Sequence, residues 1–162
     1  MNNQQDRTRH EVLRQIPYGL YVVGVRGEDG RSNALVVSWM MQCSFEPPLI
    51  AVALRKDSLS CELLRQGHAF SVNLIDRNDS AIVRELVKPA RHSGDKLDGV
   101  AHMTERTGAP VIEEALAYLE CKVRSEHDAG DHVLFVGEVV GAGSQREGDV
   151  LVCADLGWHY AG

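Results

Sequence analysis

The sequence contains no run of apolar residues as long as the roughly eighteen that a membrane-spanning helix needs. Its start, MNNQQDRTRHEV, is polar and has no apolar segment of the kind found in a secretory signal peptide. The 17 Lys and Arg residues are outnumbered by 23 Asp and Glu residues and are scattered along the chain. We therefore expect no membrane segment and no nucleic-acid surface, and we expect small molecules as partners.

The motifs of several familiar chemistries are also missing. The sequence has no HExxH and no GxSxG, so zinc-protease and nucleophile-elbow hydrolase chemistry have no support. The run GAGSQREG at 141–148 lacks a third glycine in register and follows a strand pattern, which argues against a phosphate loop. His127, Asp128, Asp131 and His132 flank a turn, which a solvated hairpin tip explains better than a metal site. We expect no bound metal.

The 4 cysteines show no CxxC spacing, and they lie inside apolar segments: Cys43, Cys61, Cys121 and Cys153. Such positions favour buried free thiols over disulfides or zinc ligands. Free thiols fit a reducing compartment, so we expect a cytoplasmic protein.

Apolar and β-branched residues form several strand patterns. Residues 18–39 predict two antiparallel strands around the turn signal EDG, and 48–54 and 68–75 predict two more strands. Residues 116–144 predict a hairpin around DAGD, and 149–162 a last strand with an aromatic tail. Short helices are expected at 6–15, within 55–67 and at 79–88, and a long loop at 89–110.

Six or seven mostly antiparallel strands with short connecting helices predict a mainly β fold, a split β-barrel. The length of 162 residues suits one domain, and no linker or repeat divides the chain. We expect a single domain over 1–162, with 1–9 loosely ordered. A barrel of this size can hold a small ligand at its mouth or seam.

Three segments together carry a resemblance to a known family: NALVVSWMMQCSFEPPLIAVALRKDSLSCELLRQGHAFSVNLI, GDHVLFVGEV and LGWHYAG. In order and spacing they resemble the flavin reductase-like family, which has the FMN-binding split-barrel fold. The resemblance covers Pro17 to Gly162. It implies a homodimer that binds FMN non-covalently near the subunit interface, with NADH or NADPH as the electron donor.

The resemblance also implies which residues contact FMN. The ring and ribityl chain would be contacted by residues of the serine-to-proline segment: Ser38, Trp39, Met40, Met41, Gln42 and Ser44. The phosphate would be held by residues at the start of the following helix: Arg55, Lys56, Ser58 and Ser60, with Lys96 of the long loop as a further candidate. Related sequences often carry threonine near Val36, whose side chain cannot donate a hydrogen bond. This difference weakens that one contact.

His132 is the candidate catalytic residue that the resemblance indicates. It would orient the nicotinamide or relay a proton, with Asp131 fixing its ring, while the flavin carries out the redox chemistry. Trp158 and Tyr160, with His159 between them, would pack over the flavin.

Each of these assignments has a purely structural alternative. Trp39 and Met41 can be core residues of one strand face, and RKDSLS an ordinary capped helix start. His132 can be a surface histidine in a hairpin turn, and Lys96 a solvated side chain. The C-terminal aromatic residues can simply pin the chain end to the barrel.

The function expected is that of an NAD(P)H-dependent flavin reductase. Reduced flavin or its electrons would pass to a partner oxygenase or to another acceptor. The alternative is a non-enzymatic split-barrel protein that binds flavin or haem. The sequence decides neither the nicotinamide nor the acceptor.

Overall fold

The computed structural model describes residues 3–88 and 96–159. Its helices are α1 (Asn3–Leu13), α2 (Leu59–Gly67) and α3 (Ser80–Leu86), with short 3₁₀ turns η1 (Arg77–Asp79) and η2 (Cys153–Leu156). Its strands are β1 (Tyr21–Arg26), β2 (Ser32–Val37), β3 (Met40–Ser44), β4 (Leu49–Arg55), β5 (Ala69–Leu74), β6 (His102–Thr104), β7 (Pro110–Ile112), β8 (Ala117–Ala129) and β9 (His132–Ser144).

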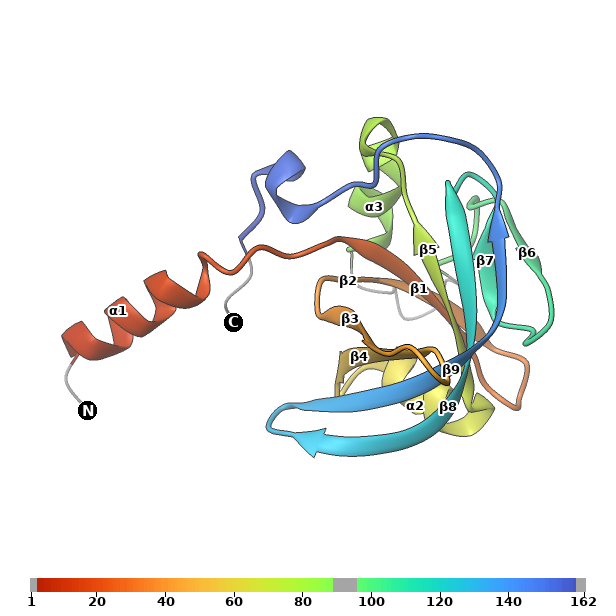
Figure 1. The fold of residues 1–162 in the computed structure, drawn as a ribbon, viewed down its shortest axis with the longest axis horizontal. Helices are drawn as coiled ribbons and strands as arrows, with labels where there is room; N and C mark the ends of the chain where they lie inside the picture. Colours follow the sequence, from red (N-terminus) through yellow and green to blue (C-terminus); the bar gives the residue numbers. More distant parts are fainter. Residues whose placement is uncertain (1–2, 89–95, 160–162) are drawn as a thin grey trace.

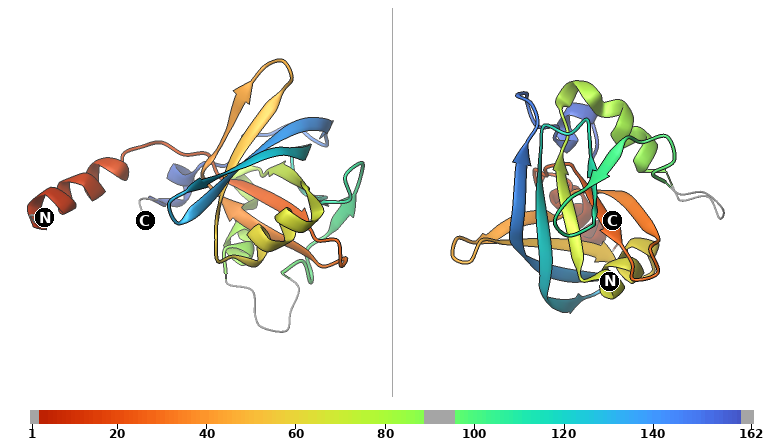
Figure 2. Two further views of the ribbon diagram at one scale, coloured as in Figure 1. Left: turned by 90° about the horizontal axis from the view of Figure 1, so that it is seen from below. Right: turned by 90° about the vertical axis from the view of Figure 1, so that its right-hand side faces the viewer.

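Seven of these strands form one antiparallel sheet in the order β2-β1-β5-β8-β9-β4-β3 (Figure 1). The long strands β8 and β9 lie at its centre, where β8 pairs with β5 and β9 pairs with β4. Register shifts in the β8–β9 pair bend the ladder, and β2 contacts β4 across the opening. The sheet therefore curls into a barrel that is open on one side, which confirms the predicted split β-barrel (Figure 2).

The apolar core has two parts. One fills the barrel and is centred on Phe70 and Phe135, both fully buried, with α2 contributing Leu63 and Leu64. The other lies where α3 and the C-terminal segment pack on β1 and β2, and it includes Val22, Val83 and Leu151 as buried members. A cavity opens beside this second cluster.

A buried polar network attaches the small β6–β7 sheet to β5. Asn73 donates through its amide nitrogen to Val22 O at 3.0 Å, and its amide oxygen accepts from Ile112 N at 2.8 Å. The Ser71 hydroxyl donates to Pro110 O. Glu120 accepts from the backbone nitrogens of Arg106 and Thr107. These bonds satisfy buried groups that would otherwise destabilise the fold.

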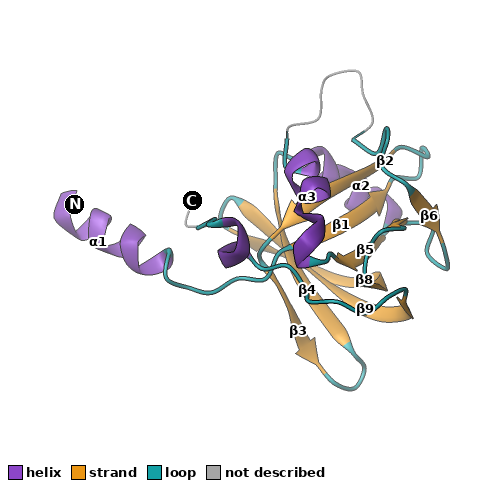
Figure 3. Cartoon of the chain, turned by 90° about the horizontal axis from the view of Figure 1, so that it is seen from above, coloured by secondary structure: helices purple, strands orange, loops and turns teal. Residues whose placement is uncertain are grey.

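Helix α1 extends away from the barrel, on the same side as the C-terminal segment (Figures 1 and 2). It starts at Asn3, earlier than predicted and within the segment for which loose order is expected. The β3–β4 hairpin also projects from the body (Figure 3). Both projections carry exposed apolar side chains: Val12, Leu13, Ile16, Met41 and Phe45.

Several sequence-based boundaries are wrong. Residues 149–159 form no strand but two isolated bridges followed by η2, because Val150 pairs only with Asp76 and Val152 only with Gly19. The predicted loop at 89–110 contains β6 and the first residue of β7 within its described part. The left-handed residue that closes α2 is His68, at φ 50°, instead of Gly67.

The cysteines are all free, but only three of them are buried. Cys61, Cys121 and Cys153 lie inside the protein, whereas Cys43 is exposed because it lies on the edge strand β3 of the projecting hairpin. The expectation of four buried thiols is therefore wrong at Cys43. Within residues 3–88 and 96–159, no helix is long and apolar enough to cross a membrane.

Candidate functional site

A cavity of about 310 Å³ opens where β2 ends, beside β4 and the start of β9. The C-terminal segment forms its remaining wall. The lining residues are mostly apolar or aromatic: Leu20, Val36, Val37, Ser38, Trp39, Ala53, Val87, His132, Cys153, Trp158 and His159.

The alternation of side chains along β4 places Ala53 on the face that lines this cavity. Val52 and Leu54 point into the core and are buried, so Ala53 and Arg55 lie on the opposite face. Arg55 is the cross-strand partner of His132, and directly paired residues share a face. The Arg55 side chain therefore starts from the face that bears Ala53 and His132, although it does not itself line the cavity.

His132 is held from two sides. Its imidazole Nδ1 lies 2.7 Å from Asp131 Oδ1, and its ring centroid lies 4.7 Å from that of Trp39. The hydrogen bond with His132 lowers the pKa of the Asp131 carboxyl. His132 is 7% exposed, so the surface-histidine alternative is wrong; a buried histidine with a fixed ring lines the cavity.

The serine-to-proline segment divides between two hollows. Ser38 and Trp39 line the main cavity. Together with Met40 and Met41 they also line a neighbouring groove of about 350 Å³, completed by Tyr18, Ala51 and Leu134. Met41 is 61% exposed, so the alternative that places it in the core is wrong.

Gln42 and Ser44 lie farther along the hairpin and line neither hollow. The Gln42 amide nitrogen donates to the Ser44 carbonyl at 3.1 Å. Their predicted contact with FMN has no support from the shape of this chain alone. The β3 strand ends at Ser44, before the two prolines.

The predicted phosphate residues do not all point the same way. Ser58 is the N-cap of α2, and its hydroxyl accepts from Cys61 N at 3.1 Å. Ser60 is 2% exposed, and its hydroxyl accepts from the Asn33 amide nitrogen at 2.8 Å. Ser60 therefore faces inward, away from any ligand, because it lies on the face of α2 that packs on β1 and β2. Arg55 and Lys56 remain as partly exposed cations, and neither lines the cavity.

Lys96 and the C-terminal aromatic residues differ in their position relative to the cavity. The Lys96 ammonium donates to Leu86 O at 3.0 Å, and burial lowers its pKa; Lys96 is therefore half-buried against the end of α3 and does not line the cavity. Trp158 lines the cavity and lies 5.8 Å beneath the Arg84 guanidinium carbon. Tyr160 lies outside the described residues.

Sequence reasoning missed part of the lining. Cys153, a member of the second core cluster, and Val87, the residue that follows α3, also line the cavity. No local motif in the sequence marks either of them. The Cys153 thiol lies 3.4 Å from Gly19 O, and burial raises its pKa. Val36 is a lining residue and supplies only apolar surface.

The arrangement suits a flat, largely apolar ring system with an anionic tail. Trp39, Val36 and Ala53 give apolar walls, and Ser38 and His132 give polar groups beside them. Arg55, Lys56 and the N-terminus of α2 are the candidates for holding an anionic group, although both cations already pair with carboxylates.

Comparison with known proteins identifies relatives over most of the chain. A family model described as "Flavin reductase like domain" matches residues 13–159. The chain is 33% identical over 156 residues to a ferric-chelate reductase (NAD(P)H) of Archaeoglobus fulgidus, covering 90% of this chain and 86% of the relative. It is also 33% identical over 131 residues to a putative diflavin flavoprotein A 3 of Synechocystis, covering 80% of this chain. The matched region spans only 22% of that flavoprotein's length.

Two solved structures resemble the fold closely. The NADH:FAD oxidoreductase SgcE6 of Streptomyces globisporus superposes with a TM-score of 0.80 at 27% identity, covering 94% of this chain and 91% of that one. An FMN-binding protein from Thermus thermophilus superposes with a TM-score of 0.75 at 30% identity, covering 82% and 74%.

Proposed function

This chain belongs to the family of flavin reductase like domains, and from that premise we propose that residues 1–162 form one domain that binds FMN and reduces it. The flavin ring would occupy the cavity lined by Trp39 and His132, and its phosphate would reach toward Arg55 and Lys56. Support comes from the alignment of Arg55, Ala53 and His132 on one face of the sheet. The FMN-binding relative from Thermus thermophilus is consistent with this ligand.

The observation that carries the proposal is the fixed pair of Trp39 and His132, both of which line an otherwise mostly apolar cavity. Bound flavin would supply the acceptor for the two electrons of a nicotinamide. The protein would supply position, because small errors in placement cost large factors in rate. His132, held by Asp131 and Trp39, would orient the nicotinamide or hold a proton near it.

A nicotinamide would enter the same cleft as the flavin, because direct hydride transfer requires the two rings to lie against each other. NADH or NADPH is the proposed donor, in line with the name of the Archaeoglobus relative. Trp158 and His159 line the cavity, and the second ring would enter beside them.

We propose that reduced flavin, or its electrons, pass to a partner oxygenase or to another acceptor. The chain matches about a fifth of the Synechocystis flavoprotein, in which the matched region is one part of a longer protein.

A homodimer is the proposed assembly. Helix α1 and the β3–β4 hairpin project from the barrel, and Phe45 on the hairpin is 89% exposed. Exposed apolar side chains gathered on two projections mark an interaction surface. A second copy related by a two-fold axis is the commonest way to cover such a surface.

Thermal unfolding and anaerobic mixing test the proposal. FMN should raise the melting temperature in a dose-dependent manner, as expected for a ligand that binds the folded state. Mixing the FMN-loaded protein with NADH or NADPH without oxygen should bleach the flavin absorbance. FMN that binds but stays oxidised with both donors would leave a non-enzymatic flavin-binding protein. The absence of any shift with FMN, FAD or riboflavin would refute flavin binding, and a haem spectrum in the purified protein would support the haem alternative.

A further inference from the structure

Both cations proposed to receive the flavin phosphate are already paired with carboxylates of this chain. Arg55 Nε lies 3.0 Å from Asp57 Oδ1, and Arg55 Nη2 lies 2.7 Å from Asp57 Oδ2, which makes a two-pronged pair. Lys56 Nζ lies 3.1 Å from Asp128 Oδ1, across the gap between the β4–α2 turn and the β8–β9 hairpin. The two carboxylates therefore compete for the same cations as the phosphate.

A third carboxylate stands beside them. The Asp131 side chain is 88% exposed, and its backbone oxygen accepts from Lys56 N at 3.1 Å. Arg55 contributes to the lowered pKa of Asp131, while the negative charge of Asp131 acts against ionisation of Asp57. Two cations thus lie among three carboxylates, so the formal charge of this cluster is negative before any ligand arrives. A phosphate dianion would meet repulsion there unless these pairs open.

We infer that Asp57 and Asp128 set the flavin selectivity of this site by competing with phosphate for Arg55 and Lys56. This inference rests on the proposed function. It means that the flavin is held chiefly through its ring, that FMN is favoured over riboflavin by less than about tenfold, and that flavin is readily exchanged.

The exposure of the paired groups explains why this competition weakens phosphate binding without abolishing it. The side chains of Arg55 and Asp57 are 64% and 70% exposed, and those of Lys56 and Asp128 are 39% and 77% exposed. Pairs this open to water are weak and sensitive to salt. A phosphate can displace the carboxylates, but it gains less than it would from free cations, and the displaced carboxylates remain close enough to repel it.

Asparagine substitutions test this inference, because they keep the size of the side chain and remove its charge. The dissociation constants of FMN and riboflavin are measured at low ionic strength for the unaltered protein, D57N, D128N and the double variant. Each single substitution should tighten FMN binding about two- to fivefold and leave riboflavin binding unchanged. The double variant should show a larger gain, and salt at about 0.5 M should reduce it.

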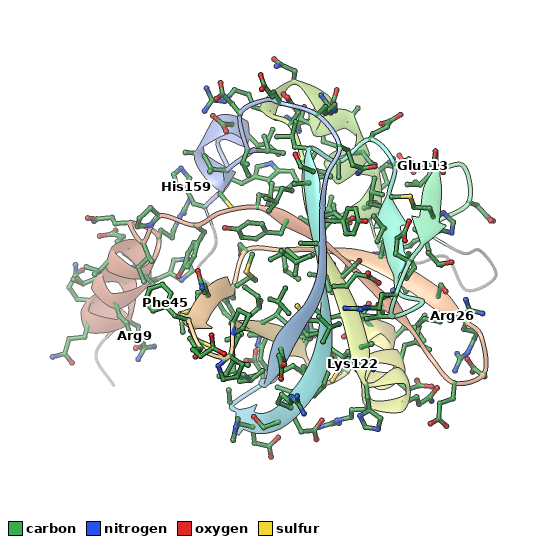
Figure 4. The ribbon with its side chains drawn as sticks, turned by 45° about the vertical axis from the view of Figure 1, so that its right-hand side comes forward. Arg9, Arg26, Phe45, Glu113, Lys122 and His159 are labelled. Atoms are coloured by element: carbon green, nitrogen blue, oxygen red, sulfur yellow. The ribbon has the colours of Figure 1, made fainter. Side chains whose placement is uncertain are left out.

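Glu113→Gln is the matched control, because it removes one exposed negative charge beside β7 on another part of the surface (Figure 4). It should change neither dissociation constant. FMN binding that is unchanged or weaker in both single variants would overturn the inference, as would equal tightening for riboflavin. An unaltered protein that prefers FMN by a hundredfold would also overturn it. Binding of neither flavin by the unaltered protein would instead refute the proposed function, and the inference with it.

Discussion

The ring centroids of Trp39 and His132 lie 4.7 Å apart, with the ring planes tilted by 52°. This separation is in the range of favourable aromatic contacts. Trp39 also accepts a hydrogen bond at its backbone oxygen from Ala53 N, at 3.0 Å, which ties the connection between β2 and β3 to β4. The contact between Trp39 and His132 therefore joins two lining residues of the cavity and fixes the imidazole against the indole ring.

Replacing His132 by alanine should lower turnover at least tenfold while changing the dissociation constant of FMN by less than about threefold. The reason is that His132 is proposed to position the nicotinamide, whereas the flavin ring keeps its other walls. Stopped-flow flavin reduction and equilibrium titration measure the two quantities. His127→Ala is the matched control, because His127 is an exposed histidine on the same hairpin. Equal losses in FMN binding and turnover would contradict the proposed role.

Ser58 allows the stability and the ligand affinity of the helix start to be separated. Ser58→Ala removes the N-cap of α2 and should lower the free energy of unfolding by about 1 kcal/mol. Ser58→Asp restores a capping oxygen, so the unfolding free energy should return to within about 0.5 kcal/mol of the unaltered value. The added charge next to Lys56 should nevertheless weaken FMN binding. Denaturant titrations and FMN titrations of the two variants check this, and unweakened FMN binding by Ser58→Asp would place the phosphate elsewhere.

Local chemistry made the helix start predictable, since a serine followed by an apolar run is a capping signal. The same pattern could not reveal that Ser60 faces inward. Its orientation depends on Asn33 of β2, a partner far along the chain. The prediction of a last strand is wrong for a related reason. Its apolar residues pack in the second core cluster, but its backbone forms only isolated bridges because no neighbouring strand pairs with it.

Some of the residues that the family resemblance indicates line the cavity, and others do not. Ser38, Trp39, His132 and Trp158 line one cavity, although they are distant in sequence. Lining residues such as Val87 and Cys153 carry no chemical signature, because an apolar wall looks like core in a sequence.

Asn73 should be among the most sensitive polar positions for stability. It is fully buried, and it bonds to Val22 O and Ile112 N as well as to the Ser71 hydroxyl. Asn73→Ala would leave buried backbone groups without partners and should lower the free energy of unfolding by about 2–3 kcal/mol. Urea denaturation measures the change. Gln42→Ala is the control, since its exposed amide makes one local bond, and it should cost less than about 0.5 kcal/mol. A similar cost for both variants would contradict the importance of the network.

Phe45 should govern self-association if the β3–β4 hairpin meets a second copy. Phe45→Ser removes the most exposed apolar ring of the described residues and should shift the protein from the mass of two chains toward that of one. Light scattering over a concentration series measures the mass. Leu59→Ser serves as the control, because Leu59 is also exposed but lies beyond the opposite end of β4. A single-chain mass for the unaltered protein at micromolar concentration with FMN present would refute the dimer.

The four thiols should differ in reactivity because only one of them is accessible. Burial raises the pKa of Cys121 to about 12, so this side chain stays a protonated thiol throughout the ordinary pH range, and thiols react as thiolates. Burial also raises the pKa of Cys61 and of Cys153. Cys43 is exposed on β3, and a small alkylating reagent should therefore modify it first.

Brief treatment of the native protein at pH 8 should add one label, located at Cys43 by peptide mass spectrometry, and Cys43→Ser should remove this fast phase. Unfolding in denaturant should expose the remaining three thiols. Cys153 lines the cavity, so FMN should slow its residual labelling while leaving that of Cys121 unchanged. Labelling of Cys153 at the same rate with and without saturating FMN would show that the flavin ring does not rest against this wall.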